Sequence, residues 1–353
     1  MTARPLSPRV PADRPVRAVL VGCGGMSAAW LRAAATVPGL EVVGLVDLNE
    51  GAALARQSEF ELLHAQTGTD LDAVLAATRP DLVFDCTIPD AHHATALTAF
   101  SHGVGVLGEK PLADTLERAQ DMVQAGQHAG LFHAVIQNRR YDPNIRRVRA
   151  FVEGGRMGAV TGVHADFFLG PHFGGFRDTM EHVLLLDMAI HTFDAARLIC
   201  GQDPVSVTCH EWNPAGSWYA HGANAVATFE MTGGVVFTYR GSWCAEGFPT
   251  TWESDWRITG TRGTVRWDGG DHPRAAVVTG TGGFFSEFEE MELPPLAPDA
   301  RTGGHEGLIR DAVRVLREGG TAETVASDNI KSLAMVLAAI ESAESGQKVS
   351  VTW

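Results

Sequence analysis

Between residues 16 and 137, short apolar runs alternate with amphipathic stretches. The runs are apolar at nearly every position instead of every second one, so both faces of each expected strand should be buried. Helix signals lie between them, such as the stop at Pro38-Gly39 and the capping-box spacing Thr69…Asp72. This pattern is typical of a parallel sheet with helices on both faces. The expected strands are residues 16–21, 40–46, 82–86, 104–107 and 131–136, and the expected helices include 50–58 and 92–102.

The pattern changes after Asn138. From residue 205 to about 290 the chain is rich in Trp, Thr and Val, and turn signals stand at Gly233-Gly234 and Gly260–Gly263. These features predict a mainly antiparallel open sheet with helices on one face. The expected helices are 143–153, 181–200, 305–318 and 328–345, with further strands at 160–169 and 349–352.

A glycine cluster follows the first expected strand and precedes a helix. Gly22 and Gly24 allow a tight turn in which backbone N–H groups approach a pyrophosphate, and the helix N-terminus favours that anion. The third position of this fingerprint is Ser27, which is small but is not glycine. Asp47 ends the second strand, where it can bind both adenosine-ribose hydroxyls and would repel a 2′-phosphate. No Arg directly follows Asp47, where the chain has Leu48 and Asn49, so NAD is favoured over NADP. The alternative is a glycine turn without a ligand.

The chain of 353 residues is long enough for two domains. We predict an α/β Rossmann domain that binds NAD over residues 16–137, and an α+β substrate and oligomerisation domain over residues 138–353. Helix 328–345 is a candidate to pack back on the Rossmann domain. Residues 1–15 contain four prolines and several arginines but no apolar core, so we expect a disordered tail and not a signal peptide.

Composition excludes several classes of function. The formal net charge of −14 argues against nucleic acid or an anionic membrane as a partner, because both require a basic face. The 5 cysteines are scattered and form no C-x-x-C pair, so a disulfide framework is not expected and the cytoplasm fits. No apolar run is long enough to span a bilayer.

Glu109-Lys110-Pro111 follows the fourth expected strand. Ligands of open α/β sheets lie at the carboxyl ends of the strands, so this segment should face the cofactor. A lysine there can hydrogen-bond a substrate hydroxyl and favour its ionised form, and Glu109 can orient the ammonium group or the cofactor ribose. The alternative is an exposed Glu–Lys pair in front of a helix.

Together these features resemble the Gfo/Idh/MocA family, named after glucose–fructose oxidoreductase, inositol dehydrogenase and a rhizopine-catabolism protein. The resemblance covers the chain from about residue 16 to the end. Family members often carry a glycine-rich stretch where this chain has residues 182–186, so no particular member's substrate is transferred. The resemblance rests on Gly22–Met26, Asp47, Ile88–His93, Glu109–Leu112, Asn138–Pro143, Gly155–Gly158, Asp187–His191 and Ser327–Ala334.

Asp187 and His191 are four residues apart in an expected helix, so their side chains share one face, with Cβ atoms roughly 6 Å apart. A neutral histidine can accept the proton of an alcohol, and Asp187 can orient the imidazole or the substrate. The resemblance implies that Lys110, Asp187 and His191 line the catalytic pocket, with His191 as acid/base and Lys110 polarising the reacting oxygen. The alternative is a polar helix face. A metal site built from His182, Asp187 and His191 is disfavoured, because the spacing is not that of a helical zinc pair.

Further candidates come from the resemblance and from residue type. The Gly/Phe-rich segment around His172 and Arg177 is a candidate lid, and Trp218, Trp243 and Trp252 are candidates to stack on a sugar ring, although aromatic residues of a sheet are more often core. The candidate cofactor residues are Gly22, Gly24, Gly25, Met26, Asp47, Pro89, His93, Glu109 and Lys110. The candidate substrate residues are Arg140, Tyr141, His172, Arg177, His182 and Trp243.

The sequence therefore predicts an NAD(H)-dependent oxidoreductase without a metal. It would transfer a hydride between nicotinamide and a secondary alcohol of a sugar, cyclitol or related polyol. The resemblance implies a homodimer or homotetramer. Two alternatives stay open: an NAD-dependent glycoside hydrolase that uses transient oxidation, and a non-catalytic protein that senses NAD or a sugar. The presence of Lys110, Asp187 and His191 argues against the sensor.

Overall fold

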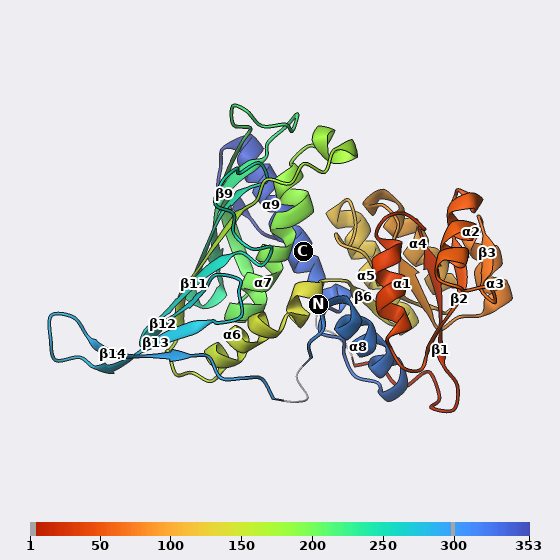
Figure 1. Ribbon diagram of the computed structural model, residues 1–353, viewed down its shortest axis with the longest axis horizontal. Coiled ribbons are helices and arrows are strands. Elements are labelled where there is room, and N and C mark those ends of the chain that lie inside the picture. The colour runs from red at the N-terminus through yellow and green to blue at the C-terminus, as the bar shows by residue number, and fades with distance from the viewer. Residues whose placement is uncertain (1–4, 298–300) are drawn as a thin grey trace. The chain divides into compact units, whose positions relative to one another are not determined.

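The computed structural model describes residues 5–297 and 301–353, which fall into two compact units (Figure 1). Unit 1 contains the described residues up to Tyr141 together with Arg301–Ile330, and unit 2 contains the described residues from Asp142 onward together with Lys331–Trp353. This division differs from the single second domain predicted for residues 138–353, because the chain returns to unit 1 at Arg301–Ile330. The Tyr141 hydroxyl donates a 2.7 Å hydrogen bond to Oδ2 of Asp311, which ties the two segments of unit 1 together.

Unit 1 is a six-stranded parallel sheet with the order β3-β2-β1-β4-β5-β6. All residues of β4 and β5 are buried, as expected for strands covered on both faces. The strand β3 was not predicted, because three residues of mixed polarity carry no periodic signal. The strands are β1 (Val16–Val21), β2 (Leu40–Val46), β3 (Gln66–Gly68), β4 (Leu82–Asp85), β5 (Gly105–Gly108) and β6 (His133–Val135). The helices are α1 (Ser27–Ala35), α2 (Glu50–Glu59), α3 (Leu71–Thr78), α4 (Pro89–Ser101), α5 (Leu116–Ala129) and α8 (Gly304–Glu318).

The disordered tail predicted for residues 1–15 is wrong for residues 5–15, and residues 1–4 lie outside the described residues. Leu6 pairs with Gly320 as an isolated antiparallel bridge, and the backbone N–H of Val10 donates to the carbonyl oxygen of Leu316 at 3.0 Å. The Val10 side chain is buried in the core that α8 shares with the sheet. Proline-rich composition therefore does not prevent this segment from packing, because the end of α8 supplies its hydrogen-bond partners.

Unit 2 is a nine-stranded sheet with the order β14-β13-β12-β11-β7-β10-β9-β8-β15. Every neighbouring pair is antiparallel except β7 and β10, which confirms the mainly antiparallel sheet. The ring of Phe193 on α7 packs edge-on against Phe229, Phe237 and Tyr239, so these strand residues face the helix layer. The strands are β7 (Val160–Phe168), β8 (Pro204–Trp212), β9 (Asn224–Met231), β10 (Val236–Ser242), β11 (Asp255–Gly260), β12 (Gly263–Trp267), β13 (Arg274–Gly280), β14 (Glu287–Glu292) and β15 (Val349–Ser350). The helices are α6 (Pro143–Glu153), α7 (Ile190–Cys200) and α9 (Ala326–Ser345), whose first five residues belong to unit 1.

The helix predicted over residues 181–200 is shorter and irregular. His182 has a φ of +50°, a left-handed conformation that cannot lie inside a helix. Leu184–Ala189 forms a π-helical turn, and the regular helix α7 begins only at Ile190. Asp187 lies in the π-helical turn and His191 lies in the first turn of α7. Turns of this kind are rare and are frequent at functional sites.

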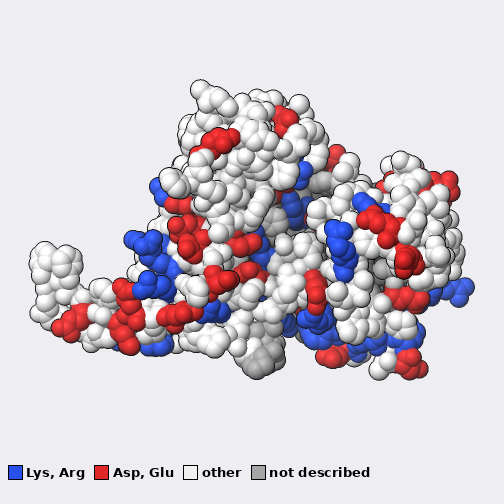
Figure 2. Space-filling view, in the orientation of Figure 1, with Lys and Arg blue, Asp and Glu red and all other residues white. Residues whose placement is uncertain are grey.

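Charge is mixed over the face of the molecule that Figure 2 shows, where basic side chains lie among acidic ones. In the part of the chain that the structure describes, no helix is both long enough and apolar enough to cross a membrane.

Candidate active site

The three glycines after β1 have different structural roles. Gly22 has a φ of +87°, and a Cβ there would lie 2.6 Å from the carbonyl oxygen of Cys86, at the end of the neighbouring strand β4. Only glycine fits this position. A Cβ on Gly24 or Gly25 would meet no atom within 4 Å. The backbone of this turn therefore faces open space, which is the cradle that a pyrophosphate needs at the start of α1.

Asp47 is tied to the glycine turn by its side chain. Its Oδ2 accepts a 2.7 Å hydrogen bond from the backbone N–H of Cys23, and its Oδ1 accepts a 2.8 Å hydrogen bond from the N–H of Asn49. A carboxylate oxygen has two acceptor positions, so each retains one for a ribose hydroxyl. The carboxylate is thus fixed at the carboxyl end of β2, beside the cradle.

Arg56 on α2 joins the same network and was not predicted from the sequence. Its Nε donates to Oγ of Ser27 at 2.9 Å, and its Nη2 donates to the carbonyl oxygen of Gly24 at 3.0 Å. The hydroxyl of Ser27 also donates to Gly24 at 2.6 Å. Ser27, the imperfect position of the fingerprint, therefore links the glycine turn to α2. No sequence signal pointed to Arg56, which follows Asp47 by nine residues.

Glu109 lies buried at the end of β5 and receives two hydrogen bonds. The indole Nε1–H of Trp30 donates to its Oε1 at 2.8 Å, and the N–H of Lys110 donates to its Oε2 at 3.1 Å. His305, at the start of α8, lies close enough to be affected electrostatically. Burial lowers the pKa of His305, and the negative charge of Glu109 opposes this shift. Glu109 thus connects α1, α8 and the Lys110 segment at one edge of the sheet.

A buried histidine on α4 holds the neighbouring loops together. His92 is 1% exposed, and its two ring nitrogens lie 2.9 Å from the carbonyl oxygen of Pro111 and 3.1 Å from that of Thr87. It also acts on Asp85 at the end of β4: burial raises the pKa of this carboxyl, and His92 opposes the shift. The ends of β4 and β5 are therefore cross-linked.

The sequence prediction singled out His93 instead, which pairs with Asp121 of α5 at 2.7 Å. The spacing of the buried residues His92, Ala96 and Ala99 on α4 is a signal that could have identified His92. Of the remaining cofactor candidates, Pro89 is the first residue of α4, and Met26 precedes α1 and is half-exposed.

In unit 2, Asp187 forms an ion pair with Arg177. The Arg177 Nε lies 2.7 Å from Oδ2 of Asp187, and Nη2 lies 3.5 Å from Oδ1. The Arg177 guanidinium carbon also lies 5.0 Å from the ring centre of Phe173 and 4.8 Å from that of Phe176. The segment Gly175–Thr179 forms a single 3₁₀ turn, which Gly174 precedes with a φ of +69°. The Gly/Phe-rich segment predicted as a lid therefore places the guanidinium group of Arg177 against the carboxylate of Asp187.

His182 pairs with Glu211 on β8. Its Nδ1 lies 2.5 Å from Oε2 of Glu211, and Nε2 lies 3.4 Å from Glu344. The hydrogen bond with Glu211 raises the pKa of His182, and burial opposes this shift. Within the described residues, no three His, Cys, Asp or Glu side chains are grouped so as to hold a metal ion.

Aromatic side chains surround the Arg177 segment. The rings of His172 and Trp218 stack with centres 3.7 Å apart, and Phe173 lies 5.9 Å from Trp243 and 6.4 Å from Trp252. Trp243 is fully buried, whereas Trp252 is half-exposed, so Trp252 is the better placed of the two to meet a ligand.

Two substrate candidates, Arg140 and Tyr141, lie in unit 1. Arg140 is buried and pairs with Asp328 at 3.1 Å, and Tyr141 is buried against α8, where it contacts Asp311. These contacts give both residues a structural role in joining the late segment of unit 1 to the early one.

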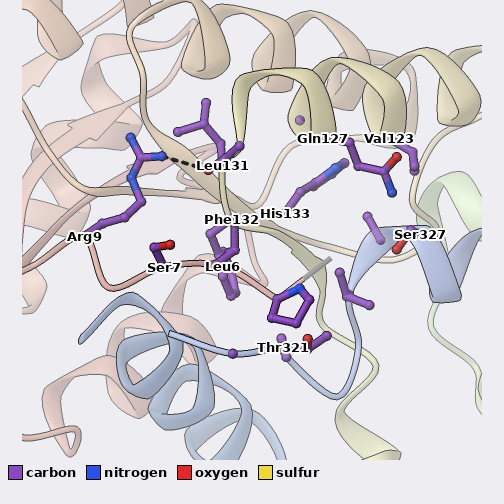
Figure 3. Close-up of a pocket in the computed structure, with 17 residues that line it drawn as sticks. Leu6, Ser7, Arg9, Val123, Gln127, Leu131, Phe132, His133, Thr321 and Ser327 are labelled. Atoms are coloured by element: carbon purple, nitrogen blue, oxygen red, sulfur yellow. Dashed lines mark hydrogen bonds between the residues drawn. The ribbon is translucent and has the colours of Figure 1, made fainter. Parts of the chain in front are cut away.

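Unit 1 also contains a cavity of about 270 Å³, which Figure 3 shows. It is lined by the segment around Leu6, the end of α5, the start of β6 and the loop between α8 and α9. The glycine turn follows a strand, whereas this cavity adjoins the start of one, so it lies at the opposite edge of the sheet from the NAD cradle. Burial lowers the pKa of His133, which lines the cavity, to about 3. The imidazole is therefore neutral, and the guanidinium group of Arg9, which also lines the cavity, donates a 2.8 Å hydrogen bond to the carbonyl oxygen of Gly130 (Figure 3).

Comparison with known proteins identifies the family. Residues 16–136 match the model described as "Oxidoreductase family, NAD-binding Rossmann fold", and residues 145–266 match the "GFO/IDH/MocA C-terminal domain". The chain belongs to the Gfo/Idh/MocA family of oxidoreductases, and NAD is its cofactor. This confirms the predicted fold and the predicted cofactor.

Named relatives are similar over most of the chain. A D-apiose dehydrogenase from Paraburkholderia graminis is 28% identical, over 95% of this chain and 89% of the relative. An inositol 2-dehydrogenase from Rhizobium meliloti is 24% identical, over 80% of this chain and 84% of the relative. The crystal structure of an oxidoreductase from Agrobacterium radiobacter in complex with NAD+, L-tartaric acid and magnesium superposes with a TM-score of 0.83 at 25% identity, covering 95% of this chain and 98% of the other.

Proposed function

We propose that this protein is an NAD-dependent dehydrogenase that oxidises a secondary alcohol of a sugar, cyclitol or related polyol. The observation that carries this proposal is the presence, in one chain, of an NAD cradle and of an Asp187–His191 pair at a π-helical turn. The similarity to proteins named for apiose and inositol, both polyhydroxylated compounds, supports the substrate class.

Three side chains divide the chemistry between them. His191 accepts the hydroxyl proton as the carbonyl double bond forms, and Lys110 stabilises the negative charge that develops on the oxygen. Asp187 orients the imidazole or the substrate. NAD, held by the glycine turn and Asp47, would supply the acceptor for the hydrogen of the carbinol carbon and its electron pair. One alcohol and NAD+ therefore give one ketone, NADH and a proton, which His191 passes to water.

A polyol also needs groups that bind its other hydroxyls. Asp178, next to Arg177, has a buried Oδ1 that has no hydrogen-bond partner among the described residues. Leaving such an oxygen unpaired costs free energy, and a substrate hydroxyl would satisfy it. The half-exposed Trp252 offers an apolar face for the carbon side of a ring.

We also propose that the enzyme prefers NAD to NADP, because the fixed carboxylate of Asp47 would repel a 2′-phosphate. Replacing Asp47 with Ala removes that repulsion as well as two backbone hydrogen bonds. We expect the variant to have a higher KM for NAD and a smaller difference between NAD and NADP. A parent enzyme that is faster with NADP would contradict this proposal.

The deciding experiment is a screen of the purified protein with NAD against sugars, cyclitols and glycosides, in which absorbance of the reduced cofactor is followed. Steady reduction with an alcohol supports the dehydrogenase. Glycoside cleavage without net reduction would favour the hydrolase, and NAD binding without any turnover would favour the sensor. His191→Ala should lower kcat by about 100-fold or more, the size of a lost general base. His64→Ala, which changes an exposed histidine of unit 1, is the control and should retain activity.

We further propose that the protein is a homodimer or homotetramer that pairs through the outer face of the nine-stranded sheet. On β9 and β10 the residues that face away from α7 include Val226 and Val236, which are 40% and 38% exposed. Sedimentation of the parent and of Val226→Asp tests this, and a monomeric parent would exclude it.

We also propose that the protein is located in the cytoplasm, because its five cysteines, all among the described residues, form no disulfide bond.

A further inference from the structure

Arg177 has one hydrogen-bonding edge in use and one open. A guanidinium group presents a side edge, formed by Nε and one Nη, and an end edge, formed by the two Nη groups. Asp187 occupies the side edge, through Nε and Nη2. Nη1 has no hydrogen-bond partner in the part of the chain that the structure describes. The end edge is therefore available to a ligand.

Other contacts hold the guanidinium in place. Phe173 and Phe176 both lie within 5.0 Å of its central carbon, and cation–π attraction acts at this range. The Arg177 side chain is 30% exposed, whereas that of Asp187 is 10% exposed, so the ion pair is anchored on its inner side and open on its outer side. A fixed planar fork of two parallel N–H groups matches a carboxylate, which it can bind through two hydrogen bonds.

The surrounding charges favour a singly charged ligand. Burial raises the pKa of Tyr219, and the negative charges of Asp178 and Asp187 add to this shift, so both carboxylates lie near the same ring. Arg177 forms the ion pair with Asp187. Two nearby carboxylates would repel a doubly charged phosphate more strongly than a singly charged carboxylate.

We infer that the substrate is a polyol that carries a carboxylate, such as a sugar acid, and that the open edge of Arg177 binds this group. The inference rests on the proposed dehydrogenase function and names its substrate class. Binding of the carboxylate at Arg177 would hold the substrate beside Asp187, which neighbours the proposed base His191. Arg177 is then a specificity residue that acts on the substrate directly.

Matched pairs of an acid and its neutral counterpart test the inference. The pairs are D-galacturonate and D-galactose, D-glucuronate and D-glucose, and L-threonate and threitol. Glucose 6-phosphate tests whether a phosphate group binds in place of the carboxylate. Binding to the NAD-loaded protein is measured by calorimetry, and turnover is measured by cofactor absorbance. We expect at least one acid to bind about 10- to 100-fold more tightly than its neutral partner, the size of a charge-assisted pair of hydrogen bonds. If no acid binds more tightly than its neutral partner, or if the phosphate binds best, the inference is overturned.

Variants separate this role from a purely structural one. Arg177→Gln should raise the KM for the acid by about 10- to 100-fold and should change the KM for the neutral partner by less than about 3-fold, and Arg177→Lys should restore part of the loss. A fall in kcat that is equal for acid and neutral substrates would mean that Arg177 only orients Asp187. Arg310→Gln, which breaks an exposed ion pair with Glu306 on α8, is the matched control. Selective binding of an acid without turnover would support the inference and contradict the dehydrogenase, whereas turnover without preference for acids would overturn the inference alone.

Discussion

The indole Nε1–H of Trp30 donates a 2.8 Å hydrogen bond to Oε1 of Glu109, and this bond joins the first helix of the NAD-binding unit to the segment that carries Lys110. Both side chains are buried, at 0% and 8% exposure, so the carboxylate has little water to replace a lost donor. A helix that follows the glycine turn is in this way fixed to a residue 79 positions later.

Trp30→Phe should therefore destabilise the protein and weaken its activity. A hydrogen bond to a charged group contributes about 1.5–3 kcal/mol to the free energy of unfolding. The variant removes one of the donors to the buried carboxylate of Glu109. Thermal unfolding and steady-state kinetics with NAD check this. The control is Trp256→Phe, which removes a 2.6 Å bond to a neutral carbonyl oxygen in unit 2. We expect the control to lower stability without changing the KM for NAD. An equal effect of both variants on that KM would contradict a specific role of the Trp30–Glu109 hydrogen bond in NAD binding.

The glycines of the turn should separate folding from binding. Gly22→Ala forces a Cβ to within 2.6 Å of a backbone oxygen at a φ of +87°, so we expect a loss of about 1–3 kcal/mol or more in the free energy of unfolding. Gly24→Ala meets no atom and should leave the melting temperature unchanged, while its methyl group enters the space of the pyrophosphate. Melting curves with and without NAD give both results. If NAD raises the melting temperature of Gly24→Ala as much as that of the parent, the pyrophosphate does not bind at this turn.

The link between Ser27 and Arg56 should act on cofactor affinity. Ser27→Ala removes the acceptor of the Arg56 Nε and a donor to Gly24, so the turn loses two hydrogen bonds that hold its shape. We expect the KM for NAD to rise by about 3- to 10-fold, equivalent to one or two ordinary hydrogen bonds, with kcat at saturating NAD unchanged. Glu59→Gln is the control, because Glu59 pairs with Nη1 of Arg56, whereas Nε and Nη2 make the hydrogen bonds to the turn. A fall in kcat without a change in KM would show that the network serves another step.

The sequence anticipates the elements that are buried on two faces, because their apolar runs leave few alternatives. The sequence analysis places α8 in the second domain, whereas the helix belongs to unit 1. The position of a helix in the chain does not determine which of two sheets it packs against. It also predicts a regular helix through Asp187, because apolar periodicity cannot distinguish a π-helical turn from an α-helical one. Arg56 and His92 escape notice for a related reason: each acts through a side chain that reaches a backbone carbonyl far along the chain. Motifs locate the backbone of the site, whereas the contacts that orient it depend on tertiary packing.

The pair of His182 and Glu211 should make stability depend on pH near the candidate site. The hydrogen bond to Glu211 raises the pKa of His182 above its ordinary value of 6.5, so the folded state holds this proton more tightly than the unfolded state does. The stabilisation is then complete below about pH 6.5 and is lost as the pH rises through the higher folded value. Melting temperatures of the parent and of His182→Gln, compared at about pH 6 and about pH 9, should differ at the lower pH and converge at the higher one. Glu211→Gln removes the acceptor and should abolish the same dependence. A difference that grows with pH would mean that the pair stabilises the fold through the neutral imidazole, and Glu211 would then not be the group that holds the proton.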